Sequence, residues 1–179
     1  MLRGGLFDNK VILKPGDLFV VNTNSSILSR AINIAQKFWS VDNESTYNHA
    51  GIIITQSGDT FESLWKVGRY HLSQYDGCKI LIVRHNMLTA QGFQNGWDKV
   101  KNWEGCLYPV PRLLLHLLHL AKYIRWKYPV CSELAARFLN GAGLKKYWWG
   151  ITPDNLGDEW RISRYYDILY DDVFDKDRL

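Results

Sequence analysis

Two short segments on either side of a Gly-Asp turn constrain the fold of this chain more than any other feature. The first, Asn48–Ile54, ends in three consecutive isoleucines, and the second, Thr60–Leu64, follows the turn directly. Strand-forming residues on both sides of a tight turn favour a β-hairpin, whose strands are antiparallel. The sequence therefore predicts an antiparallel sheet, with His49 at the mouth of one strand and Glu62 on its partner.

The other segments predict one further strand on each side of this hairpin, together with several helices. They are a strand at Leu18–Val21 after a turn at Lys14–Asp17, a helix over 25–35, a buried strand at Lys79–Arg84, a helical region from Gln91 to Asn140 broken at Gly105 and at Pro109–Pro111, and a turn at Thr152–Asn155. This order of strands followed by helices predicts an α+β fold.

The segment Pro129–Leu139 predicts a helix with a cysteine in its first turn. Apolar residues recur with the spacing of one helical face, and Asn140-Gly141 closes the segment. A thiol at Cys131 would lie near the positive end of the helix dipole and near unpaired backbone N–H groups, which both favour the thiolate. Cys131 is therefore a candidate nucleophile.

The composition is that of an ordinary globular protein. The chain has 179 residues, of which 46% are hydrophobic and 22% charged, so we expect a single domain over residues 1–179. The net charge of +4 and the lack of a Lys/Arg run argue against a nucleic-acid partner. The eight Trp and ten Tyr favour an aromatic core, and the alternative is an aromatic-lined cleft for a sugar, peptide or acyl chain.

The three cysteines, Cys78, Cys106 and Cys131, indicate neither a disulfide framework nor a zinc site, because they are odd in number and form no C-x-x-C motif. We expect no cofactor and no metal. The first residues do not resemble a signal peptide, so a cytoplasmic location is the default expectation.

The most apolar stretch, Leu113–Ala121, is too short to span a membrane. We expect it to be a buried helix. Contact with a membrane surface is the lesser alternative, favoured by the nearby Lys122, Arg125 and Lys127. His116 and His119 lie three residues apart within it, a spacing that a metal pair could share, but core packing explains them better.

A cysteine hydrolase needs a base for its thiol and a third group that orients the base. His49 is the strongest candidate base, and the alternative is a partly buried histidine that caps a strand. His71 and His85 compete less well, since both lie at loop or strand-end positions. Facing side chains on adjacent strands lie about 5 Å apart, so Glu62 could accept a hydrogen bond from His49.

Several of these motifs together resemble a known family. They are Pro15–Phe19, His49-Ala50-Gly51-Ile52, Phe61-Glu62-Ser63, Gly105–Tyr108, Cys131-Ser132-Glu133-Leu134 and Thr152–Leu156. Their order, with the histidine and the polar residue before the cysteine, is similar to that of the circularly permuted, papain-like NlpC-type thiol hydrolases. This branch includes the YiiX- and YebB-like proteins and, more distantly, the lecithin:retinol acyltransferase-like enzymes.

The resemblance implies a permuted papain-like fold, in which a central antiparallel sheet packs against helices and the nucleophile lies at a helix N-terminus. It implies Cys131 as nucleophile, His49 as general base and acid, Glu62 as orienting residue, and Tyr108 near the oxyanion or the substrate. The leading hypothesis is cleavage of an amide bond, in a peptide, an isopeptide or a peptidoglycan peptide. The alternatives are a lipid-acyl hydrolase or acyltransferase of the same fold, and a catalytically silent binding module.

Overall fold

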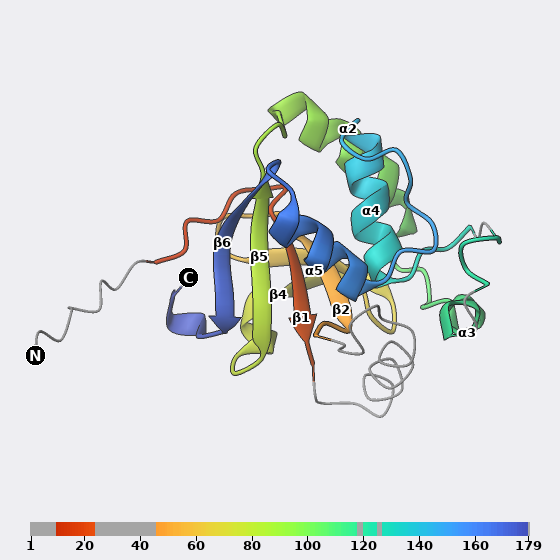
Figure 1. Cartoon of the computed structure of the whole chain (residues 1–179), viewed down its shortest axis with the longest axis horizontal. Helices are drawn as coiled ribbons and strands as arrows, with labels where there is room; N and C mark the ends of the chain where they lie inside the picture. Colours follow the sequence, from red (N-terminus) through yellow and green to blue (C-terminus); the bar gives the residue numbers. More distant parts are fainter. Residues whose placement is uncertain (1–9, 24–45, 118–119, 125–126, 179) are drawn as a thin grey trace, which may run out of the picture.

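The computed structural model describes residues 10–23, 46–117, 120–124 and 127–178 (Figure 1). A six-stranded antiparallel sheet forms its centre, in the order β4-β3-β2-β1-β5-β6. The strands are β1 (Leu18–Asn22), β2 (His49–Ile53), β3 (Asp59–Ser63), β4 (Val67–His71), β5 (Lys79–His85) and β6 (Tyr166–Val173). The predicted α+β class is confirmed, as are the β2–β3 hairpin and the strands at β1 and β5.

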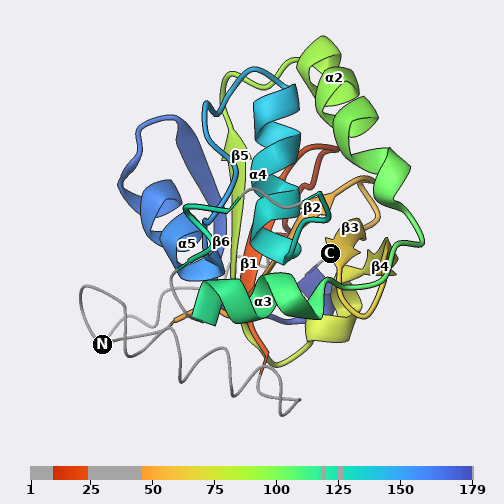
Figure 2. The same ribbon diagram turned by 90° about the vertical axis from the view of Figure 1, so that its right-hand side faces the viewer.

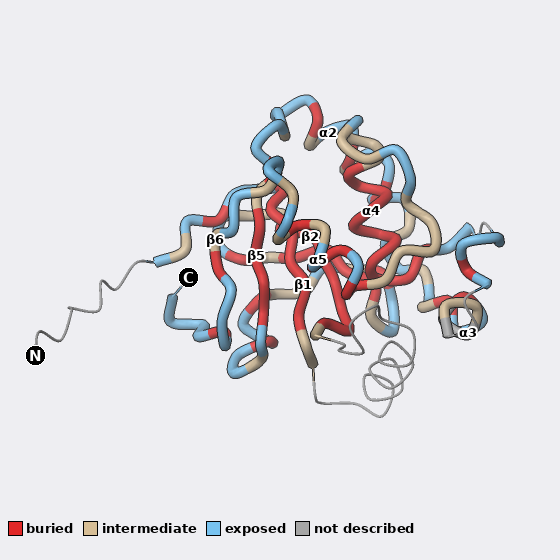
Figure 3. The backbone as a smooth tube through the Cα atoms, in the orientation of Figure 1, coloured by how far each residue is buried: buried red, intermediate tan, exposed pale blue. Residues whose placement is uncertain are grey.

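The central strands are buried on both faces because their apolar residues alternate between two cores. In β1, Leu18 and Val20 belong to the core beneath the helices, whereas Phe19 and Val21 belong to the core on the opposite face. The opposite face is covered by the short 3-10 helix η1 (Leu72–Tyr75) and by the C-terminal residues around Phe174. Figure 3 shows the resulting burial of the sheet centre, with exposed residues at the edges.

Three helices cover the first face: α2 (Ala90–Val100), α4 (Cys131–Gly141) and α5 (Pro153–Ile162) (Figures 1 and 2). The helix α4 is the innermost, with Leu134, Ala135, Phe138 and Leu139 all buried as their spacing predicts. Gly96 lets α2 approach α4 closely, since a Cβ atom there would lie 2.7 Å from the Phe138 carbonyl oxygen. This packing holds α4 against the sheet.

Two parts of the helical prediction are wrong. Thr152–Asn155 is not an isolated turn but the start of α5, where Thr152 and Asn155 form a reciprocal capping box around Pro153. The second concerns Pro111: the helical region is interrupted at Gly105 and Pro109 as predicted, but Pro111 lies inside the first turn of α3 (Val110–Leu117), which proline suits. This helix therefore starts before the predicted Leu113–Ala121.

The remaining differences concern elements that the sequence pattern did not reveal. Strands β4 and β6 were not predicted. Within the predicted buried helix Leu113–Ala121, α3 ends at Leu117, residues 115 and 116 are half-buried and Leu120 is 42% exposed, so the described side chains of this segment are not uniformly buried. The predicted helix over 25–35 lies outside the described residues, as does His119.

Candidate active site

Cys131 is the first residue of α4, as predicted. The preceding Val130 has extended backbone geometry, and its carbonyl accepts the first helical hydrogen bond, from Leu134 N at 2.9 Å. No side chain caps the helix, so its first N–H groups are not satisfied in that way. The Ser63 hydroxyl, at the end of β3, donates to the Pro129 carbonyl at 3.2 Å. This contact ties the start of α4 to the strand that carries Glu62.

His49 and Glu62 are in direct contact. The distance between His49 Nε2 and Glu62 Oε2 is 2.6 Å, and both side chains are buried. The strand register places Glu62 opposite Gly51, not opposite His49, so the contact crosses the hairpin diagonally. Gly51 leaves the space for it, because a Cβ atom there would lie 2.8 Å from Glu62 Cγ and 2.6 Å from the Phe19 ring.

The Glu62 carboxylate has three further donors. Its Oε1 accepts from the Thr60 hydroxyl and from Gln74 Nε2 at 3.2 Å, and its Oε2 accepts from the Tyr75 hydroxyl. A fully buried carboxylate with four donors is held in one orientation. Gln74 and Tyr75 lie in η1, after β4, and nothing in the sequence pattern pointed to them.

On its other side, His49 lies beside the Cys131 side chain, close enough for the sulfur to act on the imidazole. Since Nε2 faces Glu62, the nitrogen that faces the sulfur is Nδ1. Burial lowers the pKa of His49, but the negative charge of Cys131, together with the hydrogen bond and charge of Glu62, outweighs it and raises this pKa to about 10. The histidine is therefore protonated at neutral pH.

Tyr108 also lies beside the Cys131 side chain, close enough for the negative charge of the sulfur to act on its hydroxyl. Burial raises the pKa of Tyr108 well above its ordinary value, and the negative charges of Cys131 and Glu133 add to the shift. The turn at Gly105, with a φ of +85°, sets residues 105–108 alongside β4, where Gly105 N donates to the Val67 carbonyl at 2.7 Å. The structure thus brings all four predicted site residues together.

A second buried charge cluster lies one step from the sulfur, around Glu133 in the first turn of α4. Its carboxylate accepts from the Arg112 guanidinium, from His116 Nε2 at 3.2 Å and from Gly150 N at 2.8 Å. Burial opposes ionisation of Glu133, but these donors hold its pKa at about 2. His116 therefore binds a carboxylate in this cluster, and simple apolar packing does not describe it.

The other predicted candidates lie apart from this arrangement. His71 contacts Ser73 and the Ser57 carbonyl, and His85 packs against Tyr165 and Tyr166. Cys78 and Cys106 are free and half-buried.

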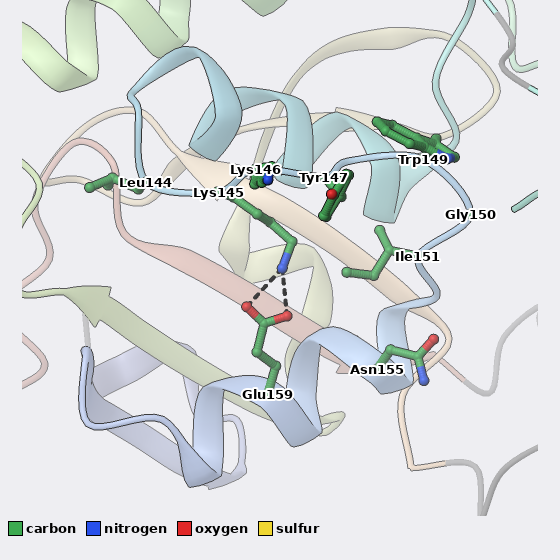
Figure 4. Close-up of a pocket in the computed structure, with 9 residues that line it drawn as sticks. All are labelled: Leu144, Lys145, Lys146, Tyr147, Trp149, Gly150, Ile151, Asn155 and Glu159. Atoms are coloured by element: carbon green, nitrogen blue, oxygen red, sulfur yellow. Dashed lines mark hydrogen bonds and ion pairs between the residues drawn. The ribbon is translucent and has the colours of Figure 1, made fainter.

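An open hollow of about 530 Å³ lies between the 144–151 loop and α5 (Figure 4). Tyr147 and Trp149 line it together with the ion pair of Lys145 and Glu159. Its wall is connected to the start of α4, because the Ser132 hydroxyl donates to the Ile151 carbonyl at 2.7 Å. The hollow thus joins aromatic and charged side chains beside the helix that carries the thiol.

The fold and the buried Cys–His–Glu contacts together describe an α+β protein with a thiol beside a protonated imidazole. Comparison with known protein families finds no match, and comparison with curated proteins finds none either. Among solved structures, the chain is similar to that of the metalloprotein yiiX from Escherichia coli O157:H7, with a TM-score of 0.54 and 21% identity. The match covers 73% of this chain and 67% of that one. The chain therefore has a YiiX-like fold.

Because yiiX is described as a metalloprotein, we asked whether this chain could hold a metal. Among the residues that the structure describes, no group of three or more His, Cys, Asp or Glu side chains is placed to hold a metal ion. A protein metal site of the usual kind needs three or four such ligands. The described residues therefore do not fit such a centre.

Proposed function

We propose that this protein is a single-domain, permuted papain-like cysteine hydrolase that cleaves an amide bond. The observation that carries the proposal is the position of His49, which lies beside Cys131 on one side and is hydrogen-bonded to Glu62, at 2.6 Å, on the other. Nucleophile, base and orienting group in this order are the parts that acyl transfer through a thiol requires.

In this mechanism the Cys131 thiolate attacks the substrate carbonyl carbon and forms a tetrahedral oxyanion. Backbone N–H groups at the start of α4 and the Tyr108 hydroxyl are the donors available to that oxyanion. The His49 imidazolium gives its proton to the leaving amine, and the C–N bond breaks to leave a thioester. His49 then takes a proton from water, whose oxygen attacks the thioester and releases a carboxylic acid and the thiolate.

Glu62 acts on the base and not on the substrate. Its four hydrogen bonds fix the carboxylate, which fixes the ring of His49 with Nδ1 toward the sulfur. Its charge also stabilises the imidazolium that gives up the proton. Glu62 is thus a positioning residue.

Labelling with iodoacetamide tests the thiolate–imidazolium pair. We expect alkylation of Cys131 to persist at mildly acidic pH and to be lost in His49→Ala, because a lone thiol is protonated there. His71→Ala is the matched control, since His71 is not in contact with Cys131 and should leave the labelling unchanged. Circular dichroism of each variant checks that it is folded. Equal labelling of Cys78, Cys106 and Cys131 would contradict the proposal.

The bond that is cleaved is tested separately. Incubation with peptidoglycan fragments, with an isopeptide and with a fatty-acyl ester distinguishes release of an amine from release of a fatty acid. We expect release of an amine, and a loss of about 10²-fold in kcat for Tyr108→Phe if its hydroxyl stabilises the oxyanion. Release of fatty acid alone would favour the acyl-hydrolase alternative, and labelling without turnover of any substrate would favour a binding module.

A further inference from the structure

Three lysine–tyrosine pairs lie exposed on the two segments beside the start of α4. In each pair the lysine Nζ lies over the ring of the next residue, at 5.0 Å in the first pair and 5.4 Å in the others. The three tyrosines are 73%, 38% and 58% exposed. The pairs are Lys122–Tyr123, Lys127–Tyr128 and Lys146–Tyr147.

The two segments are neighbours in space. A Cβ atom on Gly150 would lie 2.7 Å from the Lys122 Cα atom, so the backbones touch there. Arg137 connects them again, because it donates to the Lys127 carbonyl at 2.8 Å and lies 3.6 Å from the centre of the Trp148 ring. Residues 120–124, 127–128 and 146–147 therefore form one region, which we call the Lys–Tyr surface.

The segment 120–124 is attached through its backbone, which leaves its apolar side chains outside. The buried Arg112 donates to the Ala121 carbonyl at 3.0 Å and to the Ile124 carbonyl. Ala121 is buried, whereas Leu120 and Ile124 are 42% and 41% exposed. An apolar side chain that stays in water contributes no hydrophobic stabilisation. The exposed side chains of Leu120 and Ile124 therefore form a surface suited to an apolar partner.

Charge around this surface is one-sided. Between Gly105 and Gly150 the sequence holds seven Lys or Arg but a single acidic residue, Glu133. That carboxylate is fully buried and paired with Arg112, so it does not offset the exposed lysines. The remainder of the chain has 15 Lys or Arg against 17 Asp or Glu. Arg112 and Arg137 are buried and Lys145 is paired with Glu159, so the exposed positive charge of this stretch includes Lys122, Lys127 and Lys146 of the Lys–Tyr surface.

We propose that the Lys–Tyr surface binds an anionic lipid bilayer. Tyrosines at the headgroup level, lysines that meet lipid phosphates and a few shallowly inserted aliphatic side chains are the features of interfacial binding. A phosphate-rich polymer in solution would use the lysines but would gain nothing from Leu120 and Ile124. In the described part of the chain no helix is long and apolar enough to cross a membrane, so the contact is peripheral.

Co-sedimentation of the full chain with vesicles tests the proposal. We expect binding to phosphatidylcholine vesicles that contain phosphatidylglycerol, little binding to pure phosphatidylcholine, and a marked loss at about 0.5 M salt. The double variant K122E/K127E should lower the partition coefficient at least about tenfold. Y123S/I124S should lower it at least about fivefold at low salt, since the inserted area is lost.

The matched control is K14E/K79E, which changes the net charge by the same amount at two exposed lysines on the sheet side of the molecule. It should bind within about twofold of the wild type. Equal loss in this control, or equal binding to neutral vesicles, would overturn the proposal. Binding to RNA that Y123S/I124S leaves unchanged, without binding to vesicles, would assign the surface to a nucleic acid instead. Because Cys131→Ala should bind vesicles like the wild type, this test is independent of the proposed hydrolase.

Discussion

Replacement of Glu62 by glutamine tests the physical basis of the candidate site most directly. The two side chains have nearly the same shape, but the amide has one oxygen where the carboxylate has two. In the wild type, Oε1 accepts from Thr60 and Gln74, and Oε2 accepts from His49 and Tyr75. In Glu62→Gln, two of these four donors meet an NH₂ group.

The expected loss follows from this count. One of the displaced donors is a hydroxyl, from Thr60 or Tyr75, which can rotate and accept from the amide. The other donor is His49 or Gln74, depending on which oxygen the amide nitrogen replaces. His49 is buried and would lose its acceptor at a cost of about 1–3 kcal/mol, whereas Gln74 is exposed and can turn to water. The two retained hydrogen bonds now have a neutral acceptor and weaken, by about 1 kcal/mol together. We therefore expect the free energy of unfolding to fall by about 1–4 kcal/mol, with the larger losses if the amide nitrogen faces His49.

Urea unfolding of the wild type and of Glu62→Gln measures this difference in the free energy of unfolding. An unchanged m-value indicates that the folded and unfolded states of the two proteins are comparable. The matched control is Glu104→Gln, whose carboxylate pairs with Arg69 at 3.1 Å but with both side chains about half exposed. An exposed pair contributes about 0–1 kcal/mol, so the control should change little. If Glu62→Gln cost no more than Glu104→Gln, the four-donor arrangement would be wrong.

Three further predictions concern the same site. Gly51→Ala should lower the free energy of unfolding by about 1–3 kcal/mol, because its Cβ atom would collide with neighbours 2.6 Å away. Thermal unfolding measures this loss. The control Gly68→Ala should be tolerated, because the nearest atom to its Cβ would be 3.6 Å away. Cys131→Ala should lower the pKa of His49, followed by NMR titration of its ring, because a nearby negative charge is lost. The pKa of His49 is near 10 in the folded protein and 6.5 in the unfolded chain, so the charge of His49 stabilises the fold fully below pH 6.5. This stabilisation is lost as the pH rises toward 10. In Cys131→Ala it should be lost at a lower pH, because the folded pKa is lower. Tyr75→Phe should raise the pKa of His49 in the same titration, because the carboxylate it faces loses a competing donor.

The strands that the sequence predicts are those whose residues are buried on both faces. Strands β1 and β5 have continuous apolar centres, which few structures other than a central strand accommodate. The missed strands, β4 and β6, lie at the two edges of the sheet, where β6 is largely exposed and β4 only partly buried. Their pairing depends on the neighbouring strand and not on their own pattern, so their sequences carry little signal.

The candidate site divides in the same way. Cys131 and His49 could be found from the sequence because each begins a strongly apolar element, α4 and β2, whose position the core determines. Tyr75 could not be found, since it acts from a short 3-10 helix whose place depends on how the chain returns across the sheet. The diagonal contact between His49 and Glu62 could not be predicted from directly facing residues either. The space that Gly51 leaves for it is evident only once the strand register is known.

The Arg112–Glu133 pair bears on the proposed nucleophile, because the Glu133 carboxylate lies only two residues from Cys131 in the first turn of α4. An unpaired carboxylate at Glu133 would repel a negative sulfur at Cys131 in the same turn, and would compete with it for the helix dipole. Arg112 and His116 surround this carboxylate with donors inside a buried site, so its charge is offset where it arises. Gly150 completes the arrangement and attaches the 144–151 loop to the same turn. Removing Arg112 would therefore affect more than packing, because it would leave a buried negative charge beside the proposed nucleophile.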